Sequence, residues 1–418
     1  MTKRLILAFV FLSWHLVACS NGDSGISSGL PDKPSAEEDS PGTETISEEM
    51  RVKITGEDLY ISAKLDAKTD ILYWFKKCMF NELFTFYRVG TIDNNMPAPA
   101  TLPDVSPTSL LNLLSSDYIG PFNITGYGWC GGNHPYLDEV TQTARNIGYR
   151  IYIDGKEIKT DLSTLTKEIK IEVINEIMNP SKADTSSGKT LLNEILCIET
   201  VNYSIYRNNI QVLVTHEFQN EAPVTVQMYY GMQSMFDKET HTLTANGKYV
   251  DWTVQKDVST FTKKEYPSFR RFIEKSANAY QSSYLFADGL GNHEEISDDD
   301  IIFIGNSSNK TYHKIIADRE HKKGDIIHWS GVYTWFKSPV SDDDDLLCYE
   351  GVIDNKKVLF IDCKKSVDRT IQLPVDYTKK SFTIIEKSKS ITITGNKVTA
   401  KGLRIVSDGS GSCVITFD

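Results

Sequence analysis

Over most of the chain after residue 50, apolar and polar side chains alternate, and this period of two is typical of β-strands with one buried face. The alternation is clearest at 52–54, 59–63, 151–153 and 169–173, and it continues at 210–214, 224–230, 301–304, 326–336 and 382–385. Turn-forming pairs such as Asp154-Gly155 and Asn246-Gly247 separate these segments. The pattern predicts an all-β fold: a large antiparallel β-sandwich of the supersandwich or jelly-roll kind, or two stacked β units.

Helical spacing is rare in this sequence. Residues 107–115 and 268–278 are the two segments in which apolar side chains fall at helical intervals, so we expect very few helices. Four prolines in 94–107 predict a long irregular loop. We therefore divide the body into an N-terminal β unit at 51–100 and a main β-sandwich at 101–418.

The first nineteen residues have the order of an export signal. Lys3 and Arg4 precede an apolar run at 5–16 that is too short to cross a bilayer. The run then leads into Leu16-Val17-Ala18-Cys19, which resembles the lipobox of bacterial lipoproteins. The resemblance implies that residues 1–18 are a signal peptide and that the Cys19 thiol carries a lipid. Ser20 follows in place of the Asp that retains this class at the inner membrane, so the resemblance implies an outer-membrane anchor, on the cell surface or the periplasmic face.

The composition of residues 19–50 predicts a disordered acidic tether. Residues 20–50 hold eight acidic side chains against one basic side chain, with few apolar ones. Such a segment cannot bury enough surface to order itself. More than half of the chain's net charge of -11 lies there, and the body is mildly acidic. We therefore expect no nucleic-acid partner, because such proteins need a dense basic surface.

Two cysteines lie in a predicted β-hairpin at 346–364. If Asp354–Lys357 forms a four-residue turn and Ile353 faces Val358, then Cys348 faces Cys363 at a non-hydrogen-bonded position, which is close enough for a disulfide. The pair is either this cross-strand disulfide or two free buried thiols. No CxxC or Cys/His zinc spacing occurs in the sequence.

Glycines and aromatic residues crowd into Gly126–Tyr136. Here Trp129 could stack on a sugar ring, while Asn133 and His134 could supply directional hydrogen bonds. Arg145 follows downstream and could bind a carboxylate bidentately. The alternative is a packed connection in which His134 satisfies backbone carbonyls.

A second group comes from a predicted hairpin turning at Asn220-Glu221. In that register His216 shares a sheet face with Gln227 and Tyr229, and the face could line a glycan cleft. The alternative is a buried core histidine.

A third group lies at 306–314. Lys310 and His313 form a basic, titratable segment, and the aromatic run at 328–336 that contains Trp335 follows it. This segment could neutralise the carboxylate of a sugar acid, or it could be a solvated strand edge.

Acidic runs at 298–300 and 342–345 could hold Ca²⁺ through oxygen ligands, but they lack EF-hand spacing and read better as solvated turns. We predict no metal site and no other cofactor. No HExxH or P-loop motif occurs.

In its predicted membrane anchor and its predicted all-β architecture, the chain resembles the surface lipoproteins with which gut bacteria capture and degrade polysaccharides. The resemblance implies a poly- or oligosaccharide partner and a membrane contact through lipid. We expect cleavage by a lyase or glycoside hydrolase reaction, or binding without catalysis, or a structural adhesin role. The expected catalytic residues are His134, His216, Tyr229 and Arg145, and the expected ligand-binding residues are Trp129, Asn133, Gln227, Lys310, His313 and Trp335.

Overall fold

The computed structural model describes residues 46–418 except 103–106, 113–118, 245–246, 248, 253, 255–258, 262–269, 278, 287–301 and 306–309. The chain divides into two units, and the second, Glu44–Asp418, contains all of these residues. Apart from two short 3-10 turns, at Pro180–Lys182 and Val375–Tyr377, the regular structure in the described part is all β-strand. The all-β prediction is confirmed. A search of the same residues for a helix that is apolar and long enough to cross a membrane finds none.

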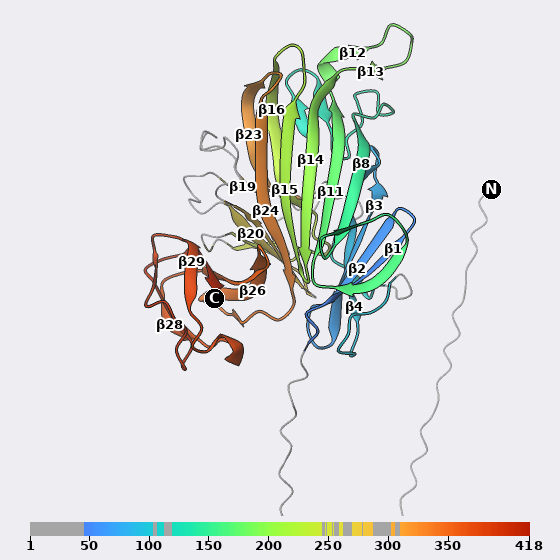
Figure 1. Cartoon of the computed structure of the whole chain (residues 1–418). Helices are drawn as coiled ribbons and strands as arrows, with labels where there is room; N and C mark the ends of the chain where they lie inside the picture. The colour runs from blue at the N-terminus through green and yellow to red at the C-terminus, as the bar shows by residue number, and fades with distance from the viewer. Residues whose placement is uncertain are drawn as a thin grey trace, which may run out of the picture. The chain divides into compact units, whose positions relative to one another are not determined.

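A ten-stranded antiparallel sheet forms the centre of the fold, and its long strands β8, β11, β14 and β15 run side by side in Figure 1. Its strands alternate between buried and partly exposed side chains, as the period of two predicts. The order is β18 (Tyr249–Asp251), β17 (His241–Thr244), β20 (Arg271–Lys275), β21 (Tyr280–Leu285), β24 (Ile326–Phe336), β15 (Asn209–Phe218), β14 (Ile195–Tyr206), β11 (Ile169–Met178), β8 (Ala144–Ile153) and β9 (Lys156–Ile158).

Two six-stranded sheets pack on this sheet and share one hydrophobic core with it. Phe75 contacts Tyr203 from one of them, with ring centroids 5.4 Å apart, and Phe122 contacts His216 from the other at 4.8 Å. The first sheet is β10 (Leu162–Thr166), β1 (Met50–Thr55), β2 (Asp58–Lys64), β3 (Thr69–Cys78), β4 (Leu83–Asp93) and β5 (Ser109–Leu110). The second is β19 (Ser259–Phe261), β22 (Ile302–Gly305), β23 (Lys310–His321), β16 (Val224–Ser234), β6 (Phe122–Ile124) and β7 (Gly128–Cys130).

The C-terminal strands build a separate core of their own. A buried ion pair joins them to the large sheet: Arg271 on β20 donates to Asp362 at 2.6 Å, and both side chains are at most 2 % exposed. One sheet is β25 (Ser341–Asp342), β26 (Leu346–Ile353), β27 (Lys356–Cys363), β32 (Gly411–Phe417) and β29 (Phe382–Lys387); the other is β28 (Val367–Ile371), β31 (Leu403–Ser407) and β30 (Ile391–Ile393), and a small hairpin elsewhere is β12 (Ala183–Asp184) with β13 (Leu191–Leu192).

The helix prediction at 268–278 is wrong, because Arg271–Lys275 is strand β20. Layers of protein cover both faces of this strand, so Phe272, Ile273 and Glu274 are all buried and no alternation is left in the sequence to mark a strand. In the other predicted helix, residues 109–110 form strand β5, and 113–118 lie outside the described residues.

The hairpin at 346–364 exists, but its predicted register is wrong by two residues. Asp354 and Asn355 adopt positive φ values of 49° and 59°, which makes a two-residue turn and closes the hairpin at Ile353 and Lys356. Cys348 therefore faces Ile361 and Cys363 faces Leu346, so the predicted disulfide does not form. All six cysteines at 78–413 are buried, and none of them forms a disulfide.

Candidate functional site

Four rings from three segments line up on the outer side of the second six-stranded sheet. Trp129 on β7 lies beside His134 with ring centroids 5.4 Å apart, and beside Tyr230 on β16 at 6.0 Å, with the ring planes within 26° of each other. Tyr230 in turn contacts Tyr312 on β23 at 4.1 Å. All four side chains are partly exposed. We call these four residues the aromatic strip.

Glycines allow the backbone to form this strip. Gly131 and Gly132 have positive φ values of 78° and 50°, and the turn they make brings His134 back beside Trp129. Gly120 has a φ of 94°, and a Cβ there would lie 1.6 Å from the carbonyl oxygen of Tyr230. The segment before β6 can therefore approach β16 closely only because residue 120 has no side chain.

Asparagines hold the loop that carries His134. The Oδ1 atom of Asn133 accepts from the Phe80 amide at 2.7 Å, so the side chain fixes the loop. Asn81 donates to the carbonyls of Gly132 and His134 at 2.8 and 3.1 Å. The predicted role of Asn133 as a ligand group thus competes with an anchoring bond within the protein.

The electrostatics of the strip are set by burial and by Lys310. Partial burial, and next the nearby ammonium of Lys310, lower the pKa of His134 to about 4. His134 is therefore neutral at pH 7, with one ring nitrogen as donor and the other as acceptor. The structure brings together Trp129, His134 and Lys310, which are three of the predicted site residues.

Tyr230 and Tyr312 belong to the strip, although neither is among the site residues expected from the sequence. In β16 the register against β6 shifts between Val226 and Met228, and this extra residue reverses the predicted alternation beyond it. Tyr229 consequently points into the core and Tyr230 outward. The signal for Tyr312 was its alternation with buried Thr311 and His313 on β23.

The predicted hairpin between β15 and β16 is wrong, because the two strands belong to different sheets. β15 pairs with β14 and β24, while β16 pairs with β23 and β6. His216 and Tyr229 do meet, with ring centroids 5.0 Å apart, but both are 0 % exposed. Tyr229 donates to the Ile119 carbonyl at 2.7 Å and accepts from Trp329 at 2.9 Å.

A row of polar side chains crosses four strands of the large sheet at this depth. Asn146 donates to Asn175, Asn175 donates to Glu199, and the Nε2 atom of His216 lies near Glu199 Oε2, each at 2.9 Å. The four residues are direct cross-strand partners. A cavity beside Glu199 and Asn175 has a volume of about 30 Å³. That volume holds one or two waters and no sugar ring.

The remaining predicted residues lie apart from the strip or inside the core. Arg145 pairs with Glu176 across β8 and β11, and Gln227 is exposed on the β16 bulge. His313 and Trp335 are 0 % exposed, so neither can touch a ligand. Burial lowers the pKa of His313 to about 3.

A pair of carboxyl groups, which the residue pattern does not reveal, lies near the end of the large sheet. Glu274 on β20 is fully buried, near the hydroxyl groups of Ser234 and Thr311. Glu239 is partly buried, accepts from Thr242 and receives the Trp252 indole N–H at 3.1 Å. Burial raises the pKa of both groups, to about 8 for Glu239, and the charge of Glu239 raises that of Glu274 further.

The acidic run at 342–345 is neutralised by bases. Asp342 lies 3.0 Å from both Lys275 and Lys364, and Asp343 lies 2.7 Å from Arg369. In the described part of the chain, no group of three or more His, Cys, Asp or Glu side chains could hold a metal ion. The run at 298–300 lies outside that part.

No family model matches the sequence, and a search of curated proteins finds no match. Solved structures with a partial likeness include the GH36 alpha-galactosidase AgaB from Geobacillus stearothermophilus, at 10 % identity and a TM-score of 0.38 over 69 % of this chain and 41 % of that one. The galactosidase domain of the alpha-galactosidase-sucrose kinase AgaSK has 11 % identity and a TM-score of 0.34, over 69 % of this chain and 42 % of that one. A polysaccharide lyase has 6 % identity and a TM-score of 0.28, over 83 % of this chain and 44 % of that one. The chain thus spans about two fifths of the length of these proteins, and likenesses this weak assign no family.

Proposed function

We propose that this protein is an envelope lipoprotein that binds a poly- or oligosaccharide on the aromatic strip without cleaving it. The observation that carries the proposal is the strip itself: four partly exposed rings from β7, its following loop, β16 and β23, set side by side. Segments far apart in the sequence converge there, beside Lys310.

The chemistry of the strip suits a saccharide. The apolar C–H face of a sugar ring packs on an aromatic ring, while its hydroxyls need donors and acceptors at the edge. Neutral His134 carries one of each, and Lys310 and the phenol groups of Tyr230 and Tyr312 carry further donors. Because the rings already contact one another, little side-chain entropy is lost when a ligand binds.

Binding is favoured over cleavage by the positions of three of the four expected catalytic groups, His216, Tyr229 and Arg145, whereas the fourth, His134, lies on the strip itself. A base must come within hydrogen-bond distance of the proton it removes. His216 and Tyr229 are sealed in the core with partners of their own, and the cavity beside Glu199 does not admit a sugar. Arg145 is held by Glu176.

We further propose that Cys19 carries the lipid and anchors the protein in the outer membrane, with the acidic segment between Cys19 and the body as the tether. The support is the lipobox-like sequence alone. Labelling with a radioactive fatty acid in the producing cells tests it. Label in the parent and not in Cys19→Ser is expected, and equal label in both would contradict the anchor.

Affinity electrophoresis of the full chain in gels containing neutral or acidic polysaccharides tests the strip. We expect at least one polysaccharide to retard the protein, and Trp129→Ala to weaken binding by about 2 kcal/mol, roughly thirtyfold, as for a central aromatic contact. Reducing ends and unsaturated products should not accumulate with the same polysaccharides.

Trp74→Ala is the matched control. Trp74 is a partly exposed Trp on the outer face of another sheet, but Lys76 covers its ring at 4.4 Å from the centroid. Retardation should be unchanged in this variant. Loss of binding in both variants, or in neither, would contradict the strip as the site, and product release would contradict binding without catalysis.

A further inference from the structure

A second feature with ligand-binding chemistry is an open pocket of about 110 Å³, between the large sheet and the C-terminal strands. Its volume is sufficient for several waters and hence for a carboxylate or sulfate group. Arg207 in the β14–β15 turn, Lys337 after β24 and Lys357 on β27 contribute positive charge, and Leu65, Glu350 and Tyr377 are among the other lining residues.

The charges in this pocket are unbalanced. Three cationic side chains line it against one carboxylate, and that carboxylate, of Glu350, already accepts from the hydroxyl of Tyr377. The Nε–H of Arg207 is buried and has no acceptor among the residues that the structure describes. A buried donor without a partner is costly, and an anion in the pocket would relieve that cost.

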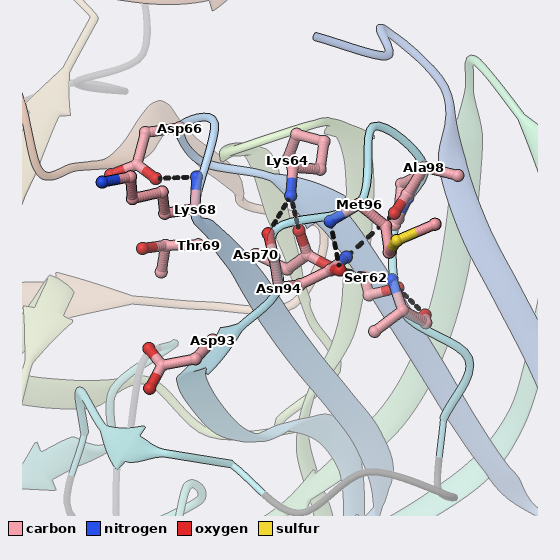
Figure 2. Close-up of polar contacts among 12 residues, drawn as sticks. Ser62, Lys64, Asp66, Lys68, Thr69, Asp70, Asp93, Asn94, Met96 and Ala98 are labelled. Atoms are coloured by element: carbon pink, nitrogen blue, oxygen red, sulfur yellow. Dashed lines mark hydrogen bonds and ion pairs between the residues drawn. The ribbon is translucent and has the colours of Figure 1, made fainter. Parts of the chain in front are cut away.

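One wall of the pocket is held rigidly. Lys64 and Asp70 are both buried, and the Lys64 Nζ lies 2.8 Å from Asp70 Oδ1 and 2.6 Å from the Asn94 carbonyl oxygen, as Figure 2 shows. The segment between Lys64 and Asp70 receives two hydrogen bonds from pocket cations: Arg207 donates to the Lys64 carbonyl at 3.3 Å and Lys337 donates to Thr69 at 3.1 Å. The buried pair therefore positions the acceptors that orient both cations.

The protein already places one of its own anions at the rim. The carboxylate of Glu48, just before β1, lies 3.0 Å from Lys357. A hydrogen bond and the charge of Lys357 lower the pKa of Glu48, and Arg207 and Lys167 contribute further. The positive potential of this region therefore acts on a carboxylate that is mostly solvated.

We infer that this pocket binds an oxyanion, the sulfate or carboxylate of a ligand, through Arg207, Lys337 and Lys357. The guanidinium supplies directional donors, and the two ammonium groups supply charge. Glu48 competes for Lys357, so it weakens the binding of an external anion.

This pocket is separate from the aromatic strip. A Cβ on Gly131 next to the strip would contact Ile177, which pairs with Cys197 on β14, whereas the pocket lies beyond Ile205, eight residues further along that strand. Eight strand residues span about 26 Å. Binding at the pocket and binding at the strip can therefore be tested independently of each other.

Isothermal titration calorimetry of the full chain with sodium sulfate tests the inference, with sodium chloride at equal ionic strength as the reference. Glucuronate and glucose form the second arm. Saturable heat is expected with sulfate or glucuronate and none with chloride or glucose. Sulfate alone would assign the pocket to a free inorganic anion, and glucuronate would assign it to an acidic sugar. Equal heat from chloride would overturn the inference.

Variants locate the site. Arg207→Gln and Lys337→Gln should each weaken the anion at least about tenfold, or 1.4 kcal/mol. Lys365→Gln, which removes an exposed lysine paired with Asp345, should change nothing. Glu48→Gln should bind a few-fold more tightly, a result that loss of folding cannot imitate. Unchanged affinity in the first two variants, or weaker binding in Glu48→Gln, would refute the site, while Trp129→Ala should leave anion affinity intact.

Discussion

Glu274→Gln should make the protein increasingly more stable than the parent as the pH rises from about 5 to about 8. Glu274 is cross-strand partner to Thr242 and Gln281, is fully buried and lies near Glu239. Because burial raises its pKa in the folded state, the folded protein keeps a proton that the unfolded chain releases above the ordinary pKa of about 4.5. Between the pKa of Glu274 in the unfolded chain and its higher pKa in the folded protein, the stability of the parent is therefore greatest at the low-pH end. It falls as the pH rises toward the folded-state pKa.

The magnitude follows from proton linkage. Each retained proton costs about 1.4 kcal/mol of unfolding free energy per pH unit between the unfolded and folded pKa values. From about pH 5 to about pH 8, the parent should lose at most about 4 kcal/mol through this group. An amide cannot ionise, so Glu274→Gln removes that dependence. Glu239, whose pKa is raised to about 8, contributes its own slope to both proteins.

Urea unfolding at four pH values between 5 and 8 measures the effect. The difference in unfolding free energy between variant and parent should grow steadily with pH in favour of the variant. Glu320→Gln, at an exposed position on β23, is the control and should follow the parent. Curves for Glu274→Gln and the parent that stay parallel over this range would show that Glu274 is ionised or well solvated in the folded protein, and the reasoning from burial would fail.

Three further predictions concern packing and thiols. Asp362→Ala should cost about 3–5 kcal/mol in urea unfolding because it leaves the buried Arg271 unpaired, whereas Asp368→Ala, which breaks an exposed pair, should cost under about 1 kcal/mol; equal costs would contradict the burial of the first pair. Gly120→Ala should lower the melting temperature and polysaccharide affinity together, since its Cβ collides with the Tyr230 carbonyl; normal values for both would show that the strand can move. Thiol titration of the unfolded, unreduced chain should find the six body cysteines reactive, and a lower count would indicate a disulfide that the structure lacks.

The strands were predictable because their local pattern is strong, but their partners were not. The alternation at 210–214 marks β15 correctly, with Val212 and Val214 facing inward. The sequence offers β16 as the nearest partner, yet β15 pairs with β14 and with β24, which lies more than a hundred residues further on. Choosing between a local hairpin and a distant partner depends on the packing of whole sheets, which one sequence does not reveal.

The candidate site was predictable only where its contacts are local in sequence. Trp129 and His134 are close in sequence, and a glycine-rich turn between them indicated their contact. Tyr230 was missed because a bulge in β16 at Val226/Met228 reverses which of the neighbouring tyrosines faces outward, and a bulge leaves little trace in the residue pattern. Glu274 was missed because a strand covered on both faces has no period of two.

The first strand of the body, β1, is held on both sides: its residues pair with β10 along one edge and with β2 along the other. If the residues before it lead to a lipid in a membrane, every pull from that membrane enters the fold at Met50. Hydrodynamic drag or a captured polymer chain would then have to break two ladders at once to peel the strand away. The chain would thus be attached to the membrane through an interior strand of its sheet. Strands β10 and β2 would share the tension along the anchor before any core residue is exposed.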